Sequence, residues 1–108
     1  PGISSIQYMF AKVSSYWNDA FVSSVHGRNT EYVEKLRECG KIGLLTDKKN
    51  TPQRIAEEVV KAGMTEATIY VGENLSYENE KIWEMPVKEM MEYERDFEMN
   101  VVLVFLQD

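Results

Sequence analysis

The sequence alternates between short apolar runs and longer segments whose apolar residues recur at helical spacing. A buried strand shows as a continuous apolar run, whereas a half-covered helix shows an apolar residue every three or four positions. Strands are predicted at residues 21–25, 42–45, 67–71 and 100–106, with a further short alternating strand at 81–84. Helices are predicted at residues 4–15, 29–39, 52–62 and, over little more than one turn, 86–91.

Residues at the ends of these segments support the predicted boundaries. Thr51 offers an N-cap oxygen, and Pro52 suits the first helical position, where no amide hydrogen is needed. Gly40 and Gly63 are placed to end the helices before them in a left-handed conformation. Cys39, one residue before Gly40, is predicted to face the core as a small apolar side chain.

The order strand, helix, strand, helix, strand with short connections predicts parallel strands joined by right-handed crossovers. The strand at 81–84 is predicted to pair antiparallel with 67–71, and the run 100–106 is too apolar to be an edge strand. We therefore expect one α/β domain with a mixed, mostly parallel sheet of about five strands flanked by helices on both faces.

The predicted topology brings three polar turns to one edge of the sheet. They follow the strands at 21–25, 42–45 and 67–71, and they comprise residues 26–28, 46–48 and 72–74. Ligands of open α/β sheets bind at the carboxyl ends of the strands, so this edge is the expected binding site.

Composition narrows the possible functions. The chain has 108 residues and a formal charge of −6, which disfavours nucleic acid as a partner. Its apolar runs are far shorter than the roughly 20 residues of a membrane span. The single cysteine cannot form an internal disulfide, which favours a reducing, cytoplasmic location. The chain opens on Pro1-Gly2 without an initiator methionine, which suggests a piece of a longer protein or a tag-cleavage scar.

The candidate chemical groups each have an ordinary structural alternative. His26 is a possible acid–base group or ligand contact, or else a turn histidine bonded to the backbone. Arg28 could pair with ligand carboxylates or form a surface ion pair. Asp47 could face a cationic ligand or bond its own turn. The methionines at 85, 90 and 91 fit either gap-filling core positions or an interface patch. No metal-ligand cluster, P-loop or GxGxxG motif occurs in the sequence.

Five segments, in order along nearly the whole chain, resemble the C-terminal half of the tetrapyrrole methylases. They are residues 1–5 (PGISS), 24–28 (SVHGR), 44–52 (LLTDKKNTP), 71–75 (VGENL) and 100–103 (NVVL). The resemblance implies the C-terminal domain of a two-domain, homodimeric class III methyltransferase, with the N-terminal domain absent from this chain. It also implies methyl transfer from S-adenosylmethionine to C5 of a corrin ring (precorrin-6Y or cobalt-precorrin-7) in cobalamin biosynthesis.

The resemblance also implies which residues contact each ligand. The cofactor-binding positions are Ser4, Ser5, Leu45, Thr46, Asp47, Glu73, Asn74 and Leu75. His26 and Arg28 are implied to face the macrocycle, whose peripheral carboxylates favour arginine. No residue is implied as a catalytic acid or base. Leu45 and Thr46 depart from the Tyr-Met-Gly turn of related enzymes, although backbone groups can make the same contacts. The alternative interpretation is a non-catalytic α/β module for ligand binding or dimerisation.

Overall fold

The computed structural model describes residues 3–13, 21–24 and 31–106. Its elements are α1 (Ile3–Lys12), β1 (Phe21–Ser24), α2 (Glu31–Cys39), β2 (Lys41–Leu45), α3 (Pro52–Lys61), β3 (Thr68–Glu73), β4 (Lys81–Pro86), α4 (Val87–Met90) and β5 (Asn100–Phe105). These are the predicted elements in the predicted order, with ends that differ by a few residues. In the described ranges, no helix has the length and hydropathy that a bilayer span requires.

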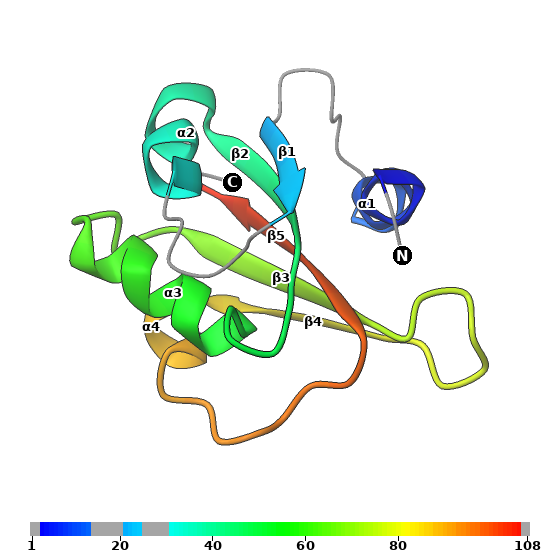
Figure 1. The fold of residues 1–108 in the computed structure, drawn as a ribbon. Coiled ribbons are helices and arrows are strands. Elements are labelled where there is room, and N and C mark those ends of the chain that lie inside the picture. The colour runs from blue at the N-terminus through cyan, green and yellow to red at the C-terminus, as the bar shows by residue number, and fades with distance from the viewer. Residues whose placement is uncertain (1–2, 14–20, 25–30, 107–108) are drawn as a thin grey trace.

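The five strands form one sheet in the order β1-β2-β5-β3-β4 (Figure 1). Among the strands that the structure describes, only β1 and β2 pair in parallel. Strand β5 runs antiparallel to both β2 and β3, and β3 runs antiparallel to β4. The expected mostly parallel sheet is therefore wrong: the sheet is mixed and mostly antiparallel. The physical reason is that β5 lies between β2 and β3, where a direct parallel pair would otherwise form.

The shared direction of β1, β2 and β3 nevertheless follows from the pairing. Because β2 and β3 are each antiparallel to β5, both run in the direction of β1. Their carboxyl ends therefore lie at the edge of the sheet where β5 begins. This is the edge at which the sequence predicted a ligand site.

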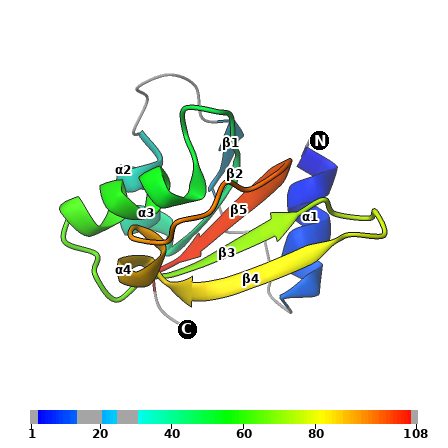
Figure 2. The same ribbon diagram turned by 90° about the horizontal axis from the view of Figure 1, so that it is seen from below.

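Helices cover both faces of the sheet, as predicted. Helix α1 packs on one face, and α2, α3 and α4 pack on the other (Figures 1 and 2). The α1 side of the core is built on Ile6, Met9, Phe10, Val101 and Leu103. The larger cluster on the opposite face includes the following residues: Leu36, Ile42, Leu44, Ile55, Val59, Ile69, Val71, Met90, Val102 and Val104. Met85 and Met90 are buried in this cluster, which makes them core residues.

The helix ends confirm the predicted caps but not the predicted place of the cysteine. Thr51 Oγ1 accepts a hydrogen bond from the Arg54 amide at 3.2 Å, which caps α3. Gly40 and Gly63 have φ angles of 84° and 92°, the left-handed region that glycine tolerates. Cys39 is exposed, so its prediction as a core residue is wrong. It lies in the last turn of α2, one residue before the chain reverses at Gly40, and there its side chain points to solvent.

A close approach of α1 to the sheet depends on Gly43 in β2. A Cβ atom at this position would lie 2.6 Å from Ile6 Cγ2, 3.2 Å from the Phe10 ring and 3.3 Å from Leu103 Cδ2. Real Cβ atoms essentially never approach other atoms within 3.0 Å. The glycine therefore allows α1 to pack directly on the centre of the sheet.

The segment between α4 and β5 is fixed by a buried carboxylate. Glu73, 2% exposed, accepts bonds from Arg95 Nη2 at 2.9 and 3.1 Å and from the Glu98 amide at 2.7 Å. The Arg95 guanidinium also lies 5.0 Å from the centre of the Trp83 ring. Burial raises the pKa of Glu73, but the bonds from Glu98 and Arg95 outweigh it and leave this pKa below its ordinary value of 4.5.

We expect Gly43→Ala to lower the free energy of unfolding by about 1–3 kcal/mol, because the added methyl group overpacks the contact between α1 and the sheet. Urea unfolding followed by circular dichroism measures this loss. Gln7→Ala, on the exposed side of α1, is the control and should change stability by less than about 0.5 kcal/mol. Equal effects of the two variants would contradict the close-packing argument.

We expect Glu73→Gln to lower the free energy of unfolding by about 1–3 kcal/mol at pH 7, since it weakens charge-assisted bonds to Arg95 and Glu98. Because the folded-state pKa of Glu73 is depressed, this contribution is present above pH 4.5 and is lost as the pH falls through that lowered pKa. Unfolding curves of both proteins between pH 7 and 3 should therefore converge at the acid end. Glu94→Gln, an exposed carboxylate of the same segment, is the control.

Candidate functional site

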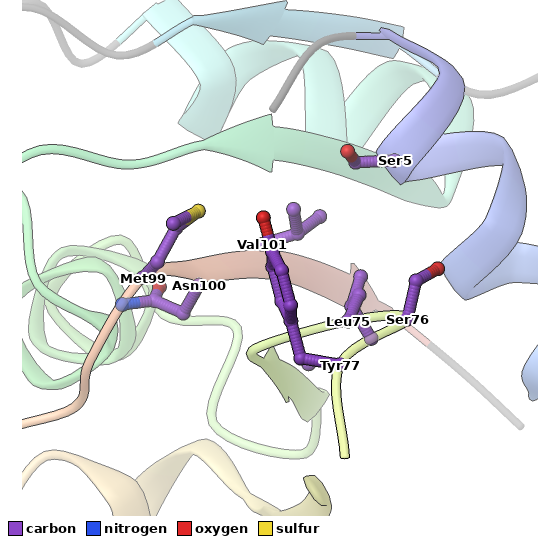
Figure 3. Close-up of a pocket in the computed structure, with 8 residues that line it drawn as sticks. Ser5, Leu75, Ser76, Tyr77, Met99, Asn100 and Val101 are labelled. Atoms are coloured by element: carbon purple, nitrogen blue, oxygen red, sulfur yellow. The ribbon is translucent and has the colours of Figure 1, made fainter. Parts of the chain in front are cut away.

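Two pockets flank the edge of the sheet where β2 and β3 end and β5 begins. The first, which we name the α1-side pocket, is lined by Ser5, Gly72, Leu75, Ser76, Tyr77, Met99, Asn100 and Val101 (Figure 3). The second, the α3-side pocket, is lined by residues 46–48, 51–53 and 95–100. Met99 and Asn100 line both, so the start of β5 separates the two hollows.

The α1-side pocket has a volume of about 360 Å³. Leu75, Met99 and Val101 supply apolar surface, Ser5, Ser76 and Asn100 supply polar groups, and Tyr77 adds an aromatic ring with a hydroxyl (Figure 3). None of the described residues that line it carries a positive charge. Such a mixture of apolar walls and few polar groups, in a volume above 300 Å³, is typical of a small-molecule site.

Gly72 forms part of the floor of this pocket. A Cβ atom there would lie 2.5 Å from Met9 Sδ and 2.8 Å from Leu75 Cδ2, so these two side chains pack directly on the glycine. Any side chain at position 72 would therefore displace Met9 of α1 or Leu75, which itself lines the pocket. Glycine in the interior of a strand commonly marks a place where a ligand or another segment approaches the backbone.

The loop between β3 and β4 forms one wall of the α1-side pocket. Two of its residues, Asn74 and Ser76, have positive φ angles of 54° and 72°. Non-glycine residues in this left-handed region are strained, and such strain persists only where surrounding contacts hold it. Two bonds hold Asn74: its amide donates to Met99 O at 2.9 Å, and its side-chain nitrogen donates to Glu98 Oε1 at 2.6 Å.

The α3-side pocket, of about 610 Å³, is bounded by the turn between β2 and α3. Asp47 Oδ1 accepts bonds from the amides of Lys49 and Asn50 at 2.9 and 2.7 Å, so this carboxylate shapes its own turn. Thr46 Oγ1 lies 2.7 Å from Asn100 Oδ1 and 3.0 Å from Asn100 O. These contacts join the end of β2 to the start of β5.

The structure brings several of the predicted site residues together. Ser5 and Leu75 line the α1-side pocket, while Thr46 and Asp47 line the α3-side pocket. Leu45 ends β2 and packs partly buried against the α1-side core. Asn74 lies between the pocket-lining residues and the segment at 98–99.

The remaining predicted residues are placed differently or lie outside the described ranges. The Glu73 side chain points to the face opposite Gly72 and bonds Arg95, so a contact with a ligand in the α1-side pocket would have to use its backbone. Ser4 belongs to the first turn of α1. His26 and Arg28 lie outside the described residues and stay predictions.

Six residues of this pocket were not among the predicted ligand contacts: Gly72, Ser76, Tyr77, Met99, Asn100 and Val101. Of these, Gly72 was expected only as part of the polar turn 72–74. Gly72 carried a usable signal, because it interrupts an apolar strand. Met99, Asn100 and Val101 carried none, since their place beside β3 depends on β5 lying between β2 and β3. Tyr77 and Met99 are the two large apolar residues found exposed in the described part of the chain, at 63% and 51%.

Across residues 3–13, 21–24 and 31–106, the structure contains no group of three or more His, Cys, Asp or Glu side chains that could hold a metal ion.

Known proteins similar to this chain were found at the levels of family, sequence and structure. The sequence profile of the Tetrapyrrole (Corrin/Porphyrin) Methylases matches residues 1–91. The chain is 38% identical over 104 residues to the cobalt-precorrin-7 C(5)-methyltransferase of Salmonella typhimurium, covering 96% of the chain and 50% of that protein. It is 32% identical over 108 residues to the probable cobalt-precorrin-7 C(5)-methyltransferase of Methanocaldococcus jannaschii, covering 99% of the chain and again 50% of the relative.

Solved structures of the same fold include two enzymes of cobalamin biosynthesis. The structure of cobalt precorrin-4 methyltransferase matches all of this chain over 52% of its own length, with a TM-score of 0.73 and 18% sequence identity. The structure of the precorrin-6Y methylase of Archaeoglobus fulgidus matches 96% of this chain over 46% of its own length, with a TM-score of 0.66 and 18% sequence identity. The chain thus spans about half the length of the relatives it matches. Because the family profile covers most of its residues, the chain belongs to the tetrapyrrole (corrin/porphyrin) methylase family.

Proposed function

We propose that this chain is the C-terminal, cofactor-binding half of a methyltransferase that moves a methyl group from S-adenosylmethionine to C5 of a corrin ring. The proposal is supported by the 38% identity to a cobalt-precorrin-7 C(5)-methyltransferase and by the coverage of half of that protein. On this view the enzyme acts in cobalamin biosynthesis, and the other half of the cofactor site belongs to an N-terminal domain.

The observation that carries the proposal is the α1-side pocket at the carboxyl ends of the strands. Its volume of about 360 Å³ suits the nucleoside part of the methyl donor, and its walls offer both apolar surface and hydrogen-bonding groups. Ser5, Asn100 and the backbone beside Gly72 would hold the polar atoms. The lack of cationic residues in its described lining also suits a donor that carries a positively charged sulfonium.

The proposed reaction requires little acid–base catalysis from the C-terminal half of the enzyme. S-adenosylmethionine supplies an already activated methyl group, so the protein has to align the ring carbon with it and exclude water. The apolar residues Leu75, Met99 and Val101 would exclude water, and Ser5 would orient the donor from α1. No residue of the chain is assigned as a catalytic acid or base.

The substrate and assembly partners complete the proposal. His26 and Arg28 would face the corrinoid, with Arg28 pairing one of its peripheral carboxylates. A homodimer is proposed from the family resemblance. A cytoplasmic location agrees with the exposed, free thiol of Cys39, because such thiols persist in reducing compartments.

We expect Ser5→Trp to abolish measurable binding of S-adenosylhomocysteine, because an indole would fill the α1-side pocket. Isothermal titration calorimetry on the full-length protein that contains this sequence measures the affinity. Gln7→Trp is the matched control: position 7 is exposed on the same helix, and the affinity should stay within about twofold of wild type. Unchanged affinity in Ser5→Trp would exclude this pocket as the cofactor site.

We also expect the full-length protein to transfer a labelled methyl group from S-adenosylmethionine to a cobalt-precorrin-7 or precorrin-6Y substrate. Nuclear magnetic resonance of the product identifies the ring carbon that carries the label. Binding of S-adenosylhomocysteine without methyl transfer to either corrinoid would contradict the proposed substrate and favour a non-catalytic binding module.

A further inference from the structure

The tip of the β3–β4 hairpin, residues 74–80, is tied to α1 by the carboxylate of Glu80. Glu80 Oε1 accepts a hydrogen bond from the Tyr8 hydroxyl at 2.7 Å and another from the Ser76 amide at 2.8 Å. Its second oxygen lies 3.5 Å from Lys12 Nζ. One carboxylate thus contacts two successive turns of α1 and the backbone of its own loop. We name this cluster of Tyr8, Lys12, Ser76 and Glu80 the Glu80 clasp.

The held loop carries three of the eight residues that line the α1-side pocket. Leu75, Ser76 and Tyr77 lie in the chain between the strained Asn74 and Glu80 (Figure 3). Within the loop, the Tyr77 amide bonds Asn74 O at 3.1 Å and the Glu80 amide bonds Tyr77 O at 3.0 Å. Leu75 packs against the α1-side core, whereas the Tyr77 side chain is 63% exposed, so core packing does little to fix its position. The loop contacts therefore decide where Ser76 and Tyr77, the outer part of this wall, lie.

The charges in the clasp favour the tied arrangement at neutral pH. The pKa of Glu80 lies below its ordinary value, first because of the Ser76 amide and then because of the Tyr8 hydroxyl, with Lys12 adding to the effect. The pKa of Lys12 is raised by Tyr8 and Glu80. Glu80 is thus an anion and Lys12 a cation, and the bonds that Glu80 accepts are charge-assisted.

We propose that Glu80 is a positioning residue for the α1-side pocket: its carboxylate holds residues 74–80 against α1, so that Leu75, Ser76 and Tyr77 form a closed wall against the nucleoside of the methyl donor. The inference rests on the proposed function. In this arrangement the loop is already ordered before the ligand binds. Less of the binding free energy is therefore lost to ordering the loop. Glu80 itself contacts no ligand.

The clasp lies apart from the hydrophobic core. Tyr8, Lys12 and Glu80 belong to neither group of buried core residues, and the Glu80 side chain is 21% exposed. Loss of the carboxylate should therefore release the loop while the sheet and its helices stay folded. This separates a positioning role from a general contribution to stability.

The test compares Glu80→Ala, Glu80→Gln, Tyr8→Phe and the double variant Tyr8→Phe/Glu80→Ala in the full-length protein, with Glu78→Ala as the control. Glu78 is exposed on the same loop. We expect the dissociation constant of S-adenosylhomocysteine to rise about tenfold in Glu80→Ala and about threefold in Tyr8→Phe. Glu80→Gln keeps an acceptor oxygen and should recover part of the loss. In the Glu80→Ala background, Tyr8→Phe should not raise the dissociation constant further, because the carboxylate that Tyr8 bonds is already absent.

Two further measurements separate positioning from unfolding. Amide hydrogen exchange at residues 75–80 should become at least about tenfold faster in Glu80→Ala, while exchange in β3 and β5 stays unchanged. In steady-state assays KM for S-adenosylmethionine should rise with kcat unchanged at saturation. Glu78→Ala should match wild type in both measurements.

The outcomes distinguish this inference from the function on which it rests. Wild-type protein that binds S-adenosylhomocysteine, with Glu80→Ala binding equally tightly, would overturn the role of Glu80 and leave the proposed function standing. Additive losses in the double variant, or faster exchange throughout the sheet, would also overturn it. Wild-type protein that binds no S-adenosylhomocysteine would refute the proposed function, and this inference with it.

Discussion

The pairing of β5 with both β2 and β3 is the constraint on which the rest of the structure depends. Val101 and Leu103 bury their side chains toward α1, while Val102 and Val104 bury theirs toward the opposite helices. One strand thus contributes to both halves of the core and joins two pairs of strands that would otherwise be separate. The hydrogen bonds that β5 makes to β2 and to β3 also pair its backbone N–H and C=O groups, which would be costly to bury without partners. The start of the same strand, at Met99 and Asn100, separates the two pockets at the ligand-binding edge.

Carboxylates shape the loops around those pockets. Asp47 accepts two amide bonds in the turn after β2, Glu73 accepts the Glu98 amide in the segment before β5, and Glu80 accepts the Ser76 amide in the β3–β4 loop. Each of these side chains is an anion that bonds backbone N–H groups close to a pocket wall. Although the chain has a formal charge of −6, some of its acidic side chains therefore stabilise local loop structure. The Glu73 side chain, at a position that the family resemblance implies contacts the cofactor, pairs with Arg95.

The two glycines on the α1 face have related roles. Gly43 lets α1 approach the centre of the sheet, and Gly72 lets Met9 of α1 and Leu75 pack directly on the end of β3. Helix α1 is thereby held close to the sheet at both points. A small-molecule site beside such a helix benefits, because the helix supplies a rigid wall while the loops supply the polar contacts.

The sequence by itself determined the order and type of all the elements, the caps at Thr51, Gly40 and Gly63, and the central place of the last strand. These features depend on local spacing, on backbone conformations that few residues allow, and on the burial of a continuous apolar run. The family could also be recognised, because its segments keep their order along the chain. Only the tertiary structure decided that β5 separates β2 from β3, that Cys39 faces solvent, and that Met99, Asn100 and Tyr77 meet Ser5. Each of these results depends on contacts between segments distant in sequence. The spacing of apolar residues within one segment does not predict which other segments pack against it.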